Sequence, residues 1–332
     1  MRISGRPAIL AAIFAVALPT AAAAAPLKVE AEDAGDHHVA AQGSFPGGLR
    51  HSWEWKMGSR RSTTNITGIT AQGLLAVHRV TGLDEHQKAA LRTARSLIKA
   101  YDAGWSKRRP HTQDIEFLAS AGFIIDAGRW FNVTVSRYTA PAYVDLVLSA
   151  RIRSRTPQVA AWDIASAIRA AVAVGRTDYA RALLSELVRR RPEWDRPGTG
   201  QDLARGSLLW AMGTLKTRAG LSPADESLAM ALISDLTAHQ LPSGAWLERP
   251  GSGAICTQTT AYTILGLSGW SQGKRSAARG RAWLTRSALS DQRFYYGGRI
   301  WATTYINRTG QPENDFNSEI QSEAMMALAS GR

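Results

Sequence analysis

The sequence predicts an all-α protein whose helices form two concentric rings, an (α/α)6 toroid. A polar pair followed by an apolar helix rich in small residues recurs six times, amphipathic helices lie between these copies, and strand patterns are scarce. A helix that is apolar on every side must be buried on every side, whereas a one-faced helix lies at a surface. The alternation therefore predicts inner helices ringed by outer ones, with an open solenoid as the rival arrangement.

The first 25 residues have the pattern of a secretory signal peptide. Arg2 and Arg6 form a basic start, residues 8–18 are an uninterrupted apolar run, and small residues suited to cleavage follow at 21–25. The run is too short for a stable membrane anchor, and no later run is long enough to span a membrane. We therefore expect cleavage and a periplasmic or secreted mature protein without a membrane span.

A polar lead segment is expected over residues 26–50, and the toroid domain over residues 51–332. The adjacent His37 and His38 fall in this lead and are expected to be solvated rather than bound to a metal. The best strand candidate, residues 131–135, is short.

The six repeated units are defined by the second residue of their polar pair. These residues are Asn65, Asp114, Asp163, Asp202, Gln258 and Glu319. Apolar helices are expected over 117–125, 164–174, 203–215, 260–267 and 320–329, and amphipathic helices over 84–101, 177–191, 223–238 and 274–289.

One stretch resembles a known superfamily. Residues 240–246 read Gln-Leu-Pro-Ser-Gly-Ala-Trp, matching the Gln-x-x-x-Gly-x-Trp repeat of terpenoid cyclases and prenyltransferases, and residues 257–267 resemble an inner helix of these toroids. Residues 317–328 resemble inner helices of toroids more widely, including secreted polysaccharide lyases and glycosidases. The resemblance implies the fold. The cyclases' Asp-x-Asp-Asp motif is absent, and no aspartate neighbours the only cysteine, Cys256, as the prenyltransferase zinc site requires.

The charge points to an anionic partner. The formal net charge is +13, and a signal peptide carrying Arg2 and Arg6 would remove only two positive charges. Such a surplus suits nucleic acid, an acidic polysaccharide or an anionic membrane surface. The sequence shows no nucleic-acid-binding motif, and export disfavours that partner. We therefore expect an anionic polysaccharide partner and no nucleic acid.

Two chemistries are consistent with residues expected at the mouth where the inner helices begin. For β-elimination on a uronic acid, Tyr296 would carry the proton while Arg299 and Asn65 neutralise the carboxylate. For hydrolysis, Asp114 and Glu319 would act as the acid and base. No metal and no cofactor is expected.

Further polar and aromatic residues near the same mouth are candidates for substrate binding. They are Trp53, Trp55, Trp162, Asp163, Asp202, Gln258, Tyr295, Trp301 and Asp315. Asp and Asn are also ordinary helix N-caps, worth about 1 kcal/mol each. The predicted function is an exported carbohydrate-active enzyme that cleaves an acidic polysaccharide by β-elimination or hydrolysis. A non-catalytic envelope toroid that binds a glycan or protein, and a terpenoid cyclase-like protein, are the alternatives.

Overall fold

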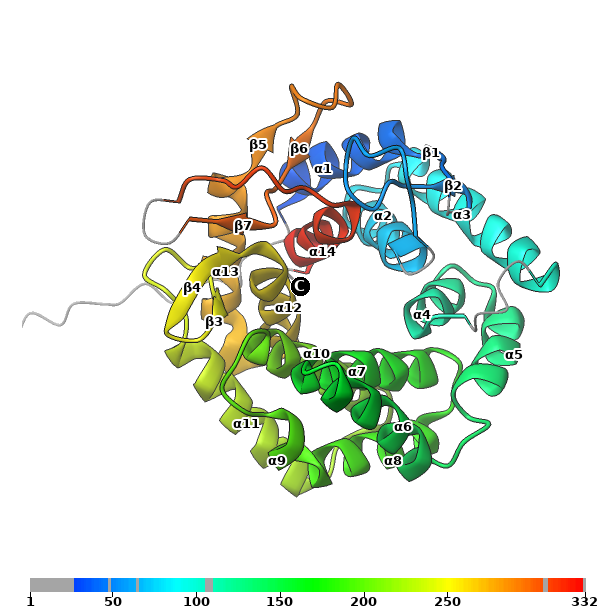
Figure 1. The fold of residues 1–332 in the computed structure, drawn as a ribbon, viewed down its shortest axis with the longest axis vertical. Coiled ribbons are helices and arrows are strands. Elements are labelled where there is room, and N and C mark those ends of the chain that lie inside the picture. The colour runs from blue at the N-terminus through cyan, green and yellow to red at the C-terminus, as the bar shows by residue number, and fades with distance from the viewer. Residues whose placement is uncertain (1–26, 47–48, 64–65, 105–109, 307–309, 331–332) are drawn as a thin grey trace, which may run out of the picture.

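Six helices surround the centre of the molecule and close into a ring (Figure 1). The computed structural model describes residues 27–46, 49–63, 66–104, 110–306 and 310–330. The inner helices are α2 (Thr67–Thr81), α4 (Thr112–Ser120), α7 (Pro157–Ala173), α10 (Gln201–Ala219), α12 (Thr257–Ser268) and α14 (Ser318–Ala329). Each packs against the next, and α14 packs against α2. The predicted (α/α)6 toroid is confirmed, and the open solenoid is excluded.

The outer helices run back along this ring. They are α1 (Lys28–Ala41), α3 (Asp84–Asp102), α5 (Ile124–Thr134), α6 (Ala140–Arg153), α8 (Thr177–Arg189), α11 (Pro223–Ala238) and α13 (Lys274–Ser287), with a short α9 (Arg191–Trp194) after α8. Among the described residues, no helix is long and apolar enough to cross a membrane.

Small antiparallel sheets lie at the mouth, where the inner helices begin. The pairs are β1 (Gly43–Ser44) with β2 (Arg50–Ser52), β3 (Leu247–Arg249) with β4 (Ser252–Cys256), β4 with β7 (Thr304–Tyr305), and β5 (Leu289–Ser290) with β6 (Arg299–Ile300). Strand β4 runs directly into α12, and the Ser52 hydroxyl at the end of β2 lies 3.3 Å from that of Thr67 at the start of α2. The strands therefore shape this one rim.

Helix α1 was not expected from the polar lead segment. It packs against α2, α3 and α14, and the prediction that His37 and His38 are solvated is wrong, because both are buried. Burial, more than the nearby His37, lowers the pKa of His38 to about 3, so its ring is neutral. The predicted strand at 131–135 is also wrong, since these residues form the end and cap of α5.

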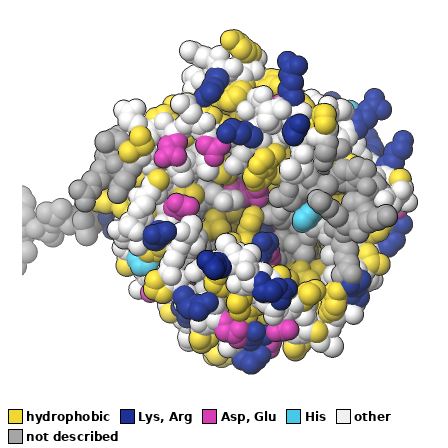
Figure 2. Space-filling view, viewed as in Figure 1, with side chains coloured by type: hydrophobic (Ala, Val, Ile, Leu, Met, Phe, Trp, Pro, Cys, Tyr) yellow, Lys and Arg dark blue, Asp and Glu magenta, His cyan; other side chains and the backbone are white. Residues whose placement is uncertain are grey.

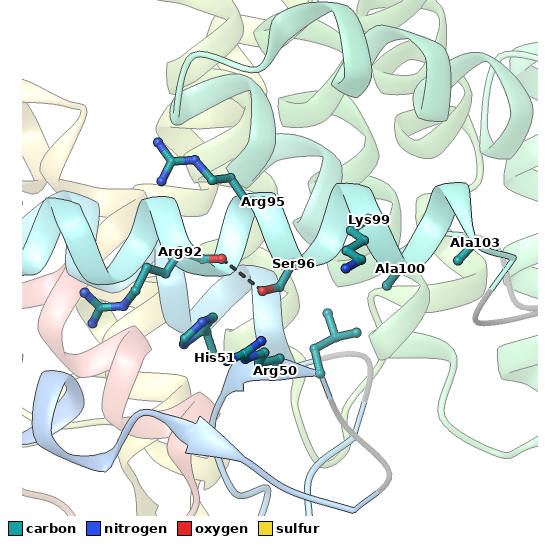
Figure 3. A pocket seen from close by; sticks show the side chains of 9 residues that line it. Arg50, His51, Arg92, Arg95, Ser96, Lys99, Ala100 and Ala103 are labelled. Carbon is teal, nitrogen blue, oxygen red and sulfur yellow. Dashed lines mark hydrogen bonds between the residues drawn. The ribbon is translucent and has the colours of Figure 1, made fainter.

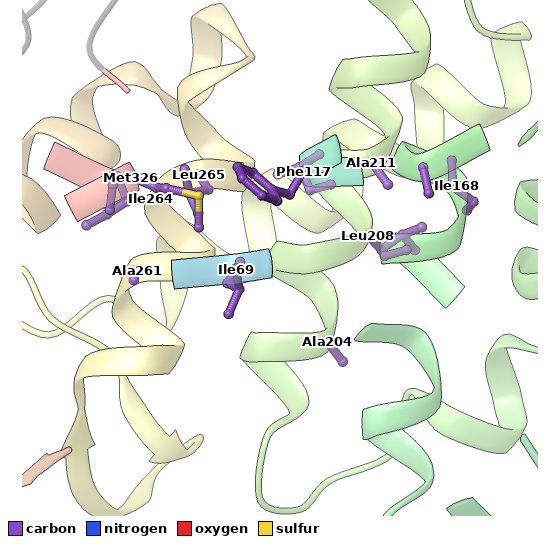
Figure 4. Close-up of a cluster of buried hydrophobic side chains, with 14 of the residues drawn as sticks. Ile69, Phe117, Ile168, Ala204, Leu208, Ala211, Ala261, Ile264, Leu265 and Met326 are labelled. Carbon is purple, nitrogen blue, oxygen red and sulfur yellow. The ribbon is translucent and has the colours of Figure 1, made fainter. Parts of the chain in front are cut away.

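Small residues allow neighbouring inner helices to touch through their backbones. A Cβ atom added at Gly266 of α12 would lie 2.5 Å from the carbonyl oxygen of Gly206 of α10. Between such contacts, apolar side chains from successive inner helices interdigitate, including Ile69, Ile168 and Leu208 (Figure 4). The density of Ala and Gly in these helices thus reflects close packing on all sides.

The Gln-x-x-x-Gly-x-Trp stretch forms the turn between α11 and β3. The Gln240 amide donates to the carbonyl oxygens of Gly244 (2.8 Å) and Ser276 (2.9 Å), and the buried Trp246 indole donates to Leu236 (2.7 Å). Gly244 has a φ of 98°, and a Cβ there would lie 2.4 Å from the Arg279 carbonyl oxygen. The motif therefore ties two outer helices together.

We expect Gly266→Ala to lower the free energy of unfolding by about 1–3 kcal/mol, because the added methyl group must separate α10 and α12. The matched control is Gly128→Ala in α5, where the added Cβ meets nothing within 4 Å and helix propensity improves. Urea unfolding of both variants checks this, and equal stability of the two would contradict the close packing.

Candidate active site

All six inner helices contribute side chains to a polar network inside the ring. Glu116 of α4 accepts from the Gln72 amide of α2 (3.1 Å) and from the Nε atom of Arg169 of α7 (3.0 and 3.1 Å). The Arg169 guanidinium lies 3.8 Å from the ring centroid of Trp210 of α10. Arg169 is 1% exposed, and its two terminal nitrogens have no hydrogen-bond partner among the described residues. A buried charge is thus held by one carboxylate and one aromatic face.

A second set of contacts crosses the ring. The Trp162 indole of α7 donates to the Tyr262 hydroxyl of α12 (2.7 Å), although α10 lies between these helices in the ring. The Gln258 amide, one turn before Tyr262, donates to Oε1 of Glu323 on α14 (3.0 Å). Side chains from α7, α12 and α14 therefore meet inside the ring.

Two buried glutamates lie one turn apart on α14. Glu319 and Glu323 are 3% and 0% exposed, and among the described residues one oxygen of each, Oε1 and Oε2 respectively, makes no hydrogen bond. Burial raises the pKa of Glu319 to about 7, with a further contribution from the charge of Asp163. Burial and the charge of Glu319 raise the pKa of Glu323 well above its ordinary value. Hydrogen bonds from Gln258 and Tyr262 oppose this rise. A protonated carboxyl group is therefore available here near neutral pH.

Asp163 lies on the inner helix opposite the one that carries this pair. It lies on α7, three places around the ring from α14, and its charge is close enough to raise the pKa of Glu319. Its Oδ2 atom accepts from Arg151 of α6 (2.7 Å to Nε), and its side chain is 30% exposed. Burial raises the pKa of Asp163, and Arg151 opposes that rise. The ring thus places an ion-paired aspartate opposite a buried glutamate.

A groove at the mouth is lined by two residues that contact this cluster, Trp162 and Gln258. Its volume is about 770 Å³, and it runs between the starts of α7, α10 and α12. Trp162 and Gln258 line it, and so do two exposed cations, Arg155 and Arg196. Figure 2 shows the face of the ring with a hollow near its middle. We call the groove between the starts of α7, α10 and α12 the mouth groove. Hydrogen bonds connect two of its lining residues to the interior: Trp162 bonds to Tyr262, and Gln258 bonds to Glu323.

The two aspartates expected at the mouth besides Asp163 are themselves buried and are held by structural partners. Asp114 accepts from the backbone amide of Gly68 on α2 (2.8 Å) and from the Tyr101 hydroxyl. Asp202 accepts from His239 Nδ1 (2.9 Å). Of the three aspartates, only Asp163 contributes to the raised pKa of Glu319, whereas Asp114 and Asp202 are held by partners in the wall of the ring.

The residues expected to perform β-elimination do not meet inside the ring. Arg299 pairs with Asp33 of α1 (2.9 Å), and the Tyr296 ring lies edge-on to His37 of the same helix. The backbone amide of Tyr296 donates to Asp291 (2.9 Å). Asn65 lies outside the described residues. The loop between β5 and β6 therefore packs onto α1.

The other aromatic candidates divide into buried and exposed residues. Trp53 and Trp301 are fully buried and donate to the carbonyl oxygens of His38 and Leu284 (2.8 Å each). Trp55 and Tyr295 are exposed, and the Trp55 carbonyl oxygen accepts from the amide of Ser318 at the start of α14. Asp315 is half-exposed beside Lys56 (3.7 Å). Only Trp55 of these aromatics lies at the mouth with an accessible ring.

Sequence reasoning missed several members of the network. It did not single out Gln72, Glu116, Arg169, Tyr262 or Glu323 as site residues. The available signal was a charged or hydroxyl-bearing residue within a helix that is otherwise apolar on all sides, since such a residue must point into the ring or find a buried partner.

One group among the described residues could offer three ligand atoms to a cation. Asp36 of α1 and Glu85 and His86 of α3 have such atoms within 4.8 Å of one another. His86 is buried and contacts Asp36 (3.0 Å), whereas both acidic residues are exposed. The group lies between two outer helices, apart from the network inside the ring.

Comparison with solved structures identifies the fold. An unsaturated glucuronyl hydrolase from Bacillus sp. GL1 is 14% identical with a TM-score of 0.60, covering 91% of this chain and 96% of that chain. The α-1,6-mannanase GH76A from Salegentibacter sp. HEL1_6 is 11% identical with a TM-score of 0.60, covering 92% and 98%. A polysaccharide lyase is 10% identical with a TM-score of 0.53, covering 91% and 97%.

These similarities define the class of architecture. The chain has the α/α toroid fold found in these carbohydrate-active proteins, as the resemblance of its last inner helix suggested. At these identities the similarity shows the fold alone. The sequence matches no protein-family model, and no curated protein matches it.

We expect the stability of this protein to fall as the pH rises from about 4.5 to 7. The pKa of Glu319 is higher in the folded protein than its ordinary value of 4.5, so folding retains a proton that the unfolded chain releases over this interval. The slope from one such group is at most about 1.4 kcal/mol per pH unit. Glu319→Gln should flatten the curve, as measured by urea unfolding at several pH values.

The control for this measurement is Glu226→Gln, which alters a partly exposed carboxylate paired with Lys216 (2.9 Å). Its curve should run parallel to that of the unaltered protein. If Glu319→Gln also runs parallel, the carboxyl group of Glu319 is not buried as described.

Proposed function

We propose that this protein is a glycoside hydrolase that acts on a polysaccharide or its fragments from within the toroid. The observation that supports this proposal is the placement of Glu319 and Asp163 on opposite inner helices, with the charge of Asp163 raising the pKa of Glu319, beside a groove lined by Trp162 and Gln258. Glycosidases commonly use two carboxyl groups whose pKa values differ, one protonated and one ionised. Two of the structural neighbours described above are named as a glucuronyl hydrolase and a mannanase, and the third is named as a polysaccharide lyase.

Glu319 serves as the general acid. Its raised pKa keeps it protonated near neutral pH, and its free Oε1 atom has no competing partner among the described residues. It donates its proton to the glycosidic oxygen as the bond to the leaving sugar breaks. Glu323, bonded to Gln258, stays protonated next to it, because burial and any negative charge on Glu319 both raise the pKa of Glu323.

Asp163 serves as the ionised partner. Arg151 favours its charged form and fixes its Oδ2 atom. The carboxylate then stabilises positive charge at the anomeric carbon, and it either activates a water molecule or attacks that carbon itself. Arg169, held by Glu116 and Trp210, supplies a fixed positive charge in the same interior.

The substrate class is an anionic glycan. Trp162 presents an aromatic face of the kind that stacks on sugar rings, and Gln258 offers an amide for hydroxyl groups. Arg155 and Arg196 add positive charge at the rim of the mouth groove, in keeping with the net charge of +13. We further propose that the protein acts after export, because residues 1–25, which lie outside the described residues, read as a signal peptide.

We expect Glu319→Gln and Asp163→Asn each to lower kcat by about 10²- to 10⁴-fold, because each removes one half of the acid–base pair. Activity is measured as new reducing ends on carboxylated and neutral polysaccharides, and as absorbance of the unsaturated uronate in parallel. The control is Asp178→Asn, an exposed residue of α8 remote from the ring interior, which should retain activity.

The two readouts separate the possible outcomes. Reducing ends without a gain of absorbance support hydrolysis, and loss of absorbance from unsaturated oligosaccharides supports removal of a terminal unsaturated uronate. A gain of absorbance would indicate β-elimination and return attention to Tyr296. Full activity of both Glu319→Gln and Asp163→Asn would refute this site. Binding of a glycan without cleavage would indicate a non-catalytic toroid.

A further inference from the structure

A second cavity lies on the outer wall of the toroid, apart from the mouth groove. It is formed by β2 and the C-terminal half of α3 and has a volume of about 610 Å³. Figure 3 shows Arg50 and His51 beside the helix that carries Arg92, Arg95 and Lys99. We call this cavity the α3 groove.

The side chains that line the α3 groove carry positive charge that neighbouring carboxylates do not neutralise. The groove is lined by four permanent cations and no carboxylate. Arg50, Arg95 and Lys99 form no ion pair with any described residue, whereas arginines of α8, α9 and α10 pair with neighbouring carboxylates. Like charges three and four residues apart destabilise a helix. Lys99 is favoured by the helix C-terminus, but Arg92 and Arg95 lie before the last turn.

The walls of the α3 groove are held in place. The Gln42 amide donates to Thr93 Oγ1 (2.9 Å), and its Oε1 atom accepts from Arg92 Nη2 (2.7 Å). The Thr93 hydroxyl donates to the His51 carbonyl oxygen (2.7 Å), and His51 has a left-handed φ of 59°. A non-glycine residue in this region stores strain that its surroundings must support. The backbone segments that carry these cations are therefore held in fixed positions.

We propose that the α3 groove binds the anionic groups of a polysaccharide chain, as a site separate from the mouth groove. Charge complementarity requires an anionic partner. A concave groove with the apolar Leu49 and Ala100 in its lining suits a chain of sugar rings better than it suits a flat lipid surface. The choice of a glycan rests on the proposed function, whereas anion binding itself does not.

The position of the α3 groove fits this role. Strand β2 leads to the start of α2 at the mouth, and the C-terminal end of α3 lies at the same rim, because α3 runs back along α2. A long chain entering the mouth could therefore extend over the rim onto α3. The groove would then hold a part of the substrate several sugars away from the reacting bond.

The test compares two charge reversals in the full chain. The variant Arg95→Glu/Lys99→Glu alters the α3 groove, and the control Lys274→Glu/Arg275→Glu makes the same change in net charge on exposed residues at the start of α13. Titration calorimetry with polygalacturonate and heparin fragments measures Kd at several salt concentrations. We expect a loss of at least tenfold for the groove variant and under twofold for the control, with a weaker salt dependence for the groove variant.

Other outcomes overturn the proposal. Equal losses in both variants would mean that only net charge matters, and binding to anionic lipid vesicles but to neither polysaccharide would assign the groove to a membrane surface. The milder Arg95→Gln/Lys99→Gln repeats the test if the reversal unfolds the protein. Asp178→Asn should bind polygalacturonate as tightly as the unaltered protein. Binding to the α3 groove is measured apart from cleavage, so failure of catalysis and failure of the groove are distinguishable.

Discussion

The closure of the inner ring between α2 and α14 is the contact on which the rest of the structure depends. It joins segments at opposite ends of the toroid, and backbone bonds reinforce it: the amide of Met57 donates to Phe316 (3.0 Å), and that of Ser318 to Trp55 (3.1 Å). Helix α1 packs on both α2 and α14. Without this closure, Glu319 would not face Asp163, because their helices are opposed only in a complete ring.

Closure also explains how polar residues can lie in the ring interior. Burying a charge is costly unless it is paired and hydrogen-bonded. Arg169 meets Glu116 and the face of Trp210, and Glu323 meets Gln258, so the ring supplies partners from several helices at once. Arg169, Glu319 and Glu323 are among the buried residues that keep an oxygen or nitrogen without a partner in the described part of the chain. An interior evolved for stability alone would be filled with apolar side chains, and these residues are better explained by a polar ligand.

The sequence predicted the fold well and the site in part. The helices predicted at 84–101 and 177–191 were recognisable because one-faced and all-round apolar patterns differ, and the Gln240–Trp246 motif is a local signature. Helix α1 was not predicted, because its hydrophobic pattern is weak. Its buried residues include Ala31, Ala34 and the neutral His38. Asp114 and Asp163 occupy equivalent repeat positions, and only three-dimensional neighbours distinguish the one held by Tyr101 and Gly68 from the one facing Glu319.

The position of α14 at the end of the toroid has a consequence for biosynthesis. Every earlier helix is made before the one that completes the ring, so the nascent chain must hold a C-shaped stack of helices open at one side. Contacts so distant in sequence form slowly. The same late segment carries Glu319 and Glu323, so a partly synthesised or proteolytically shortened chain lacks both glutamates as well as the helix that closes the ring. Under the proposed function, ring closure and activity therefore depend on a single helix, and an incomplete chain is inactive.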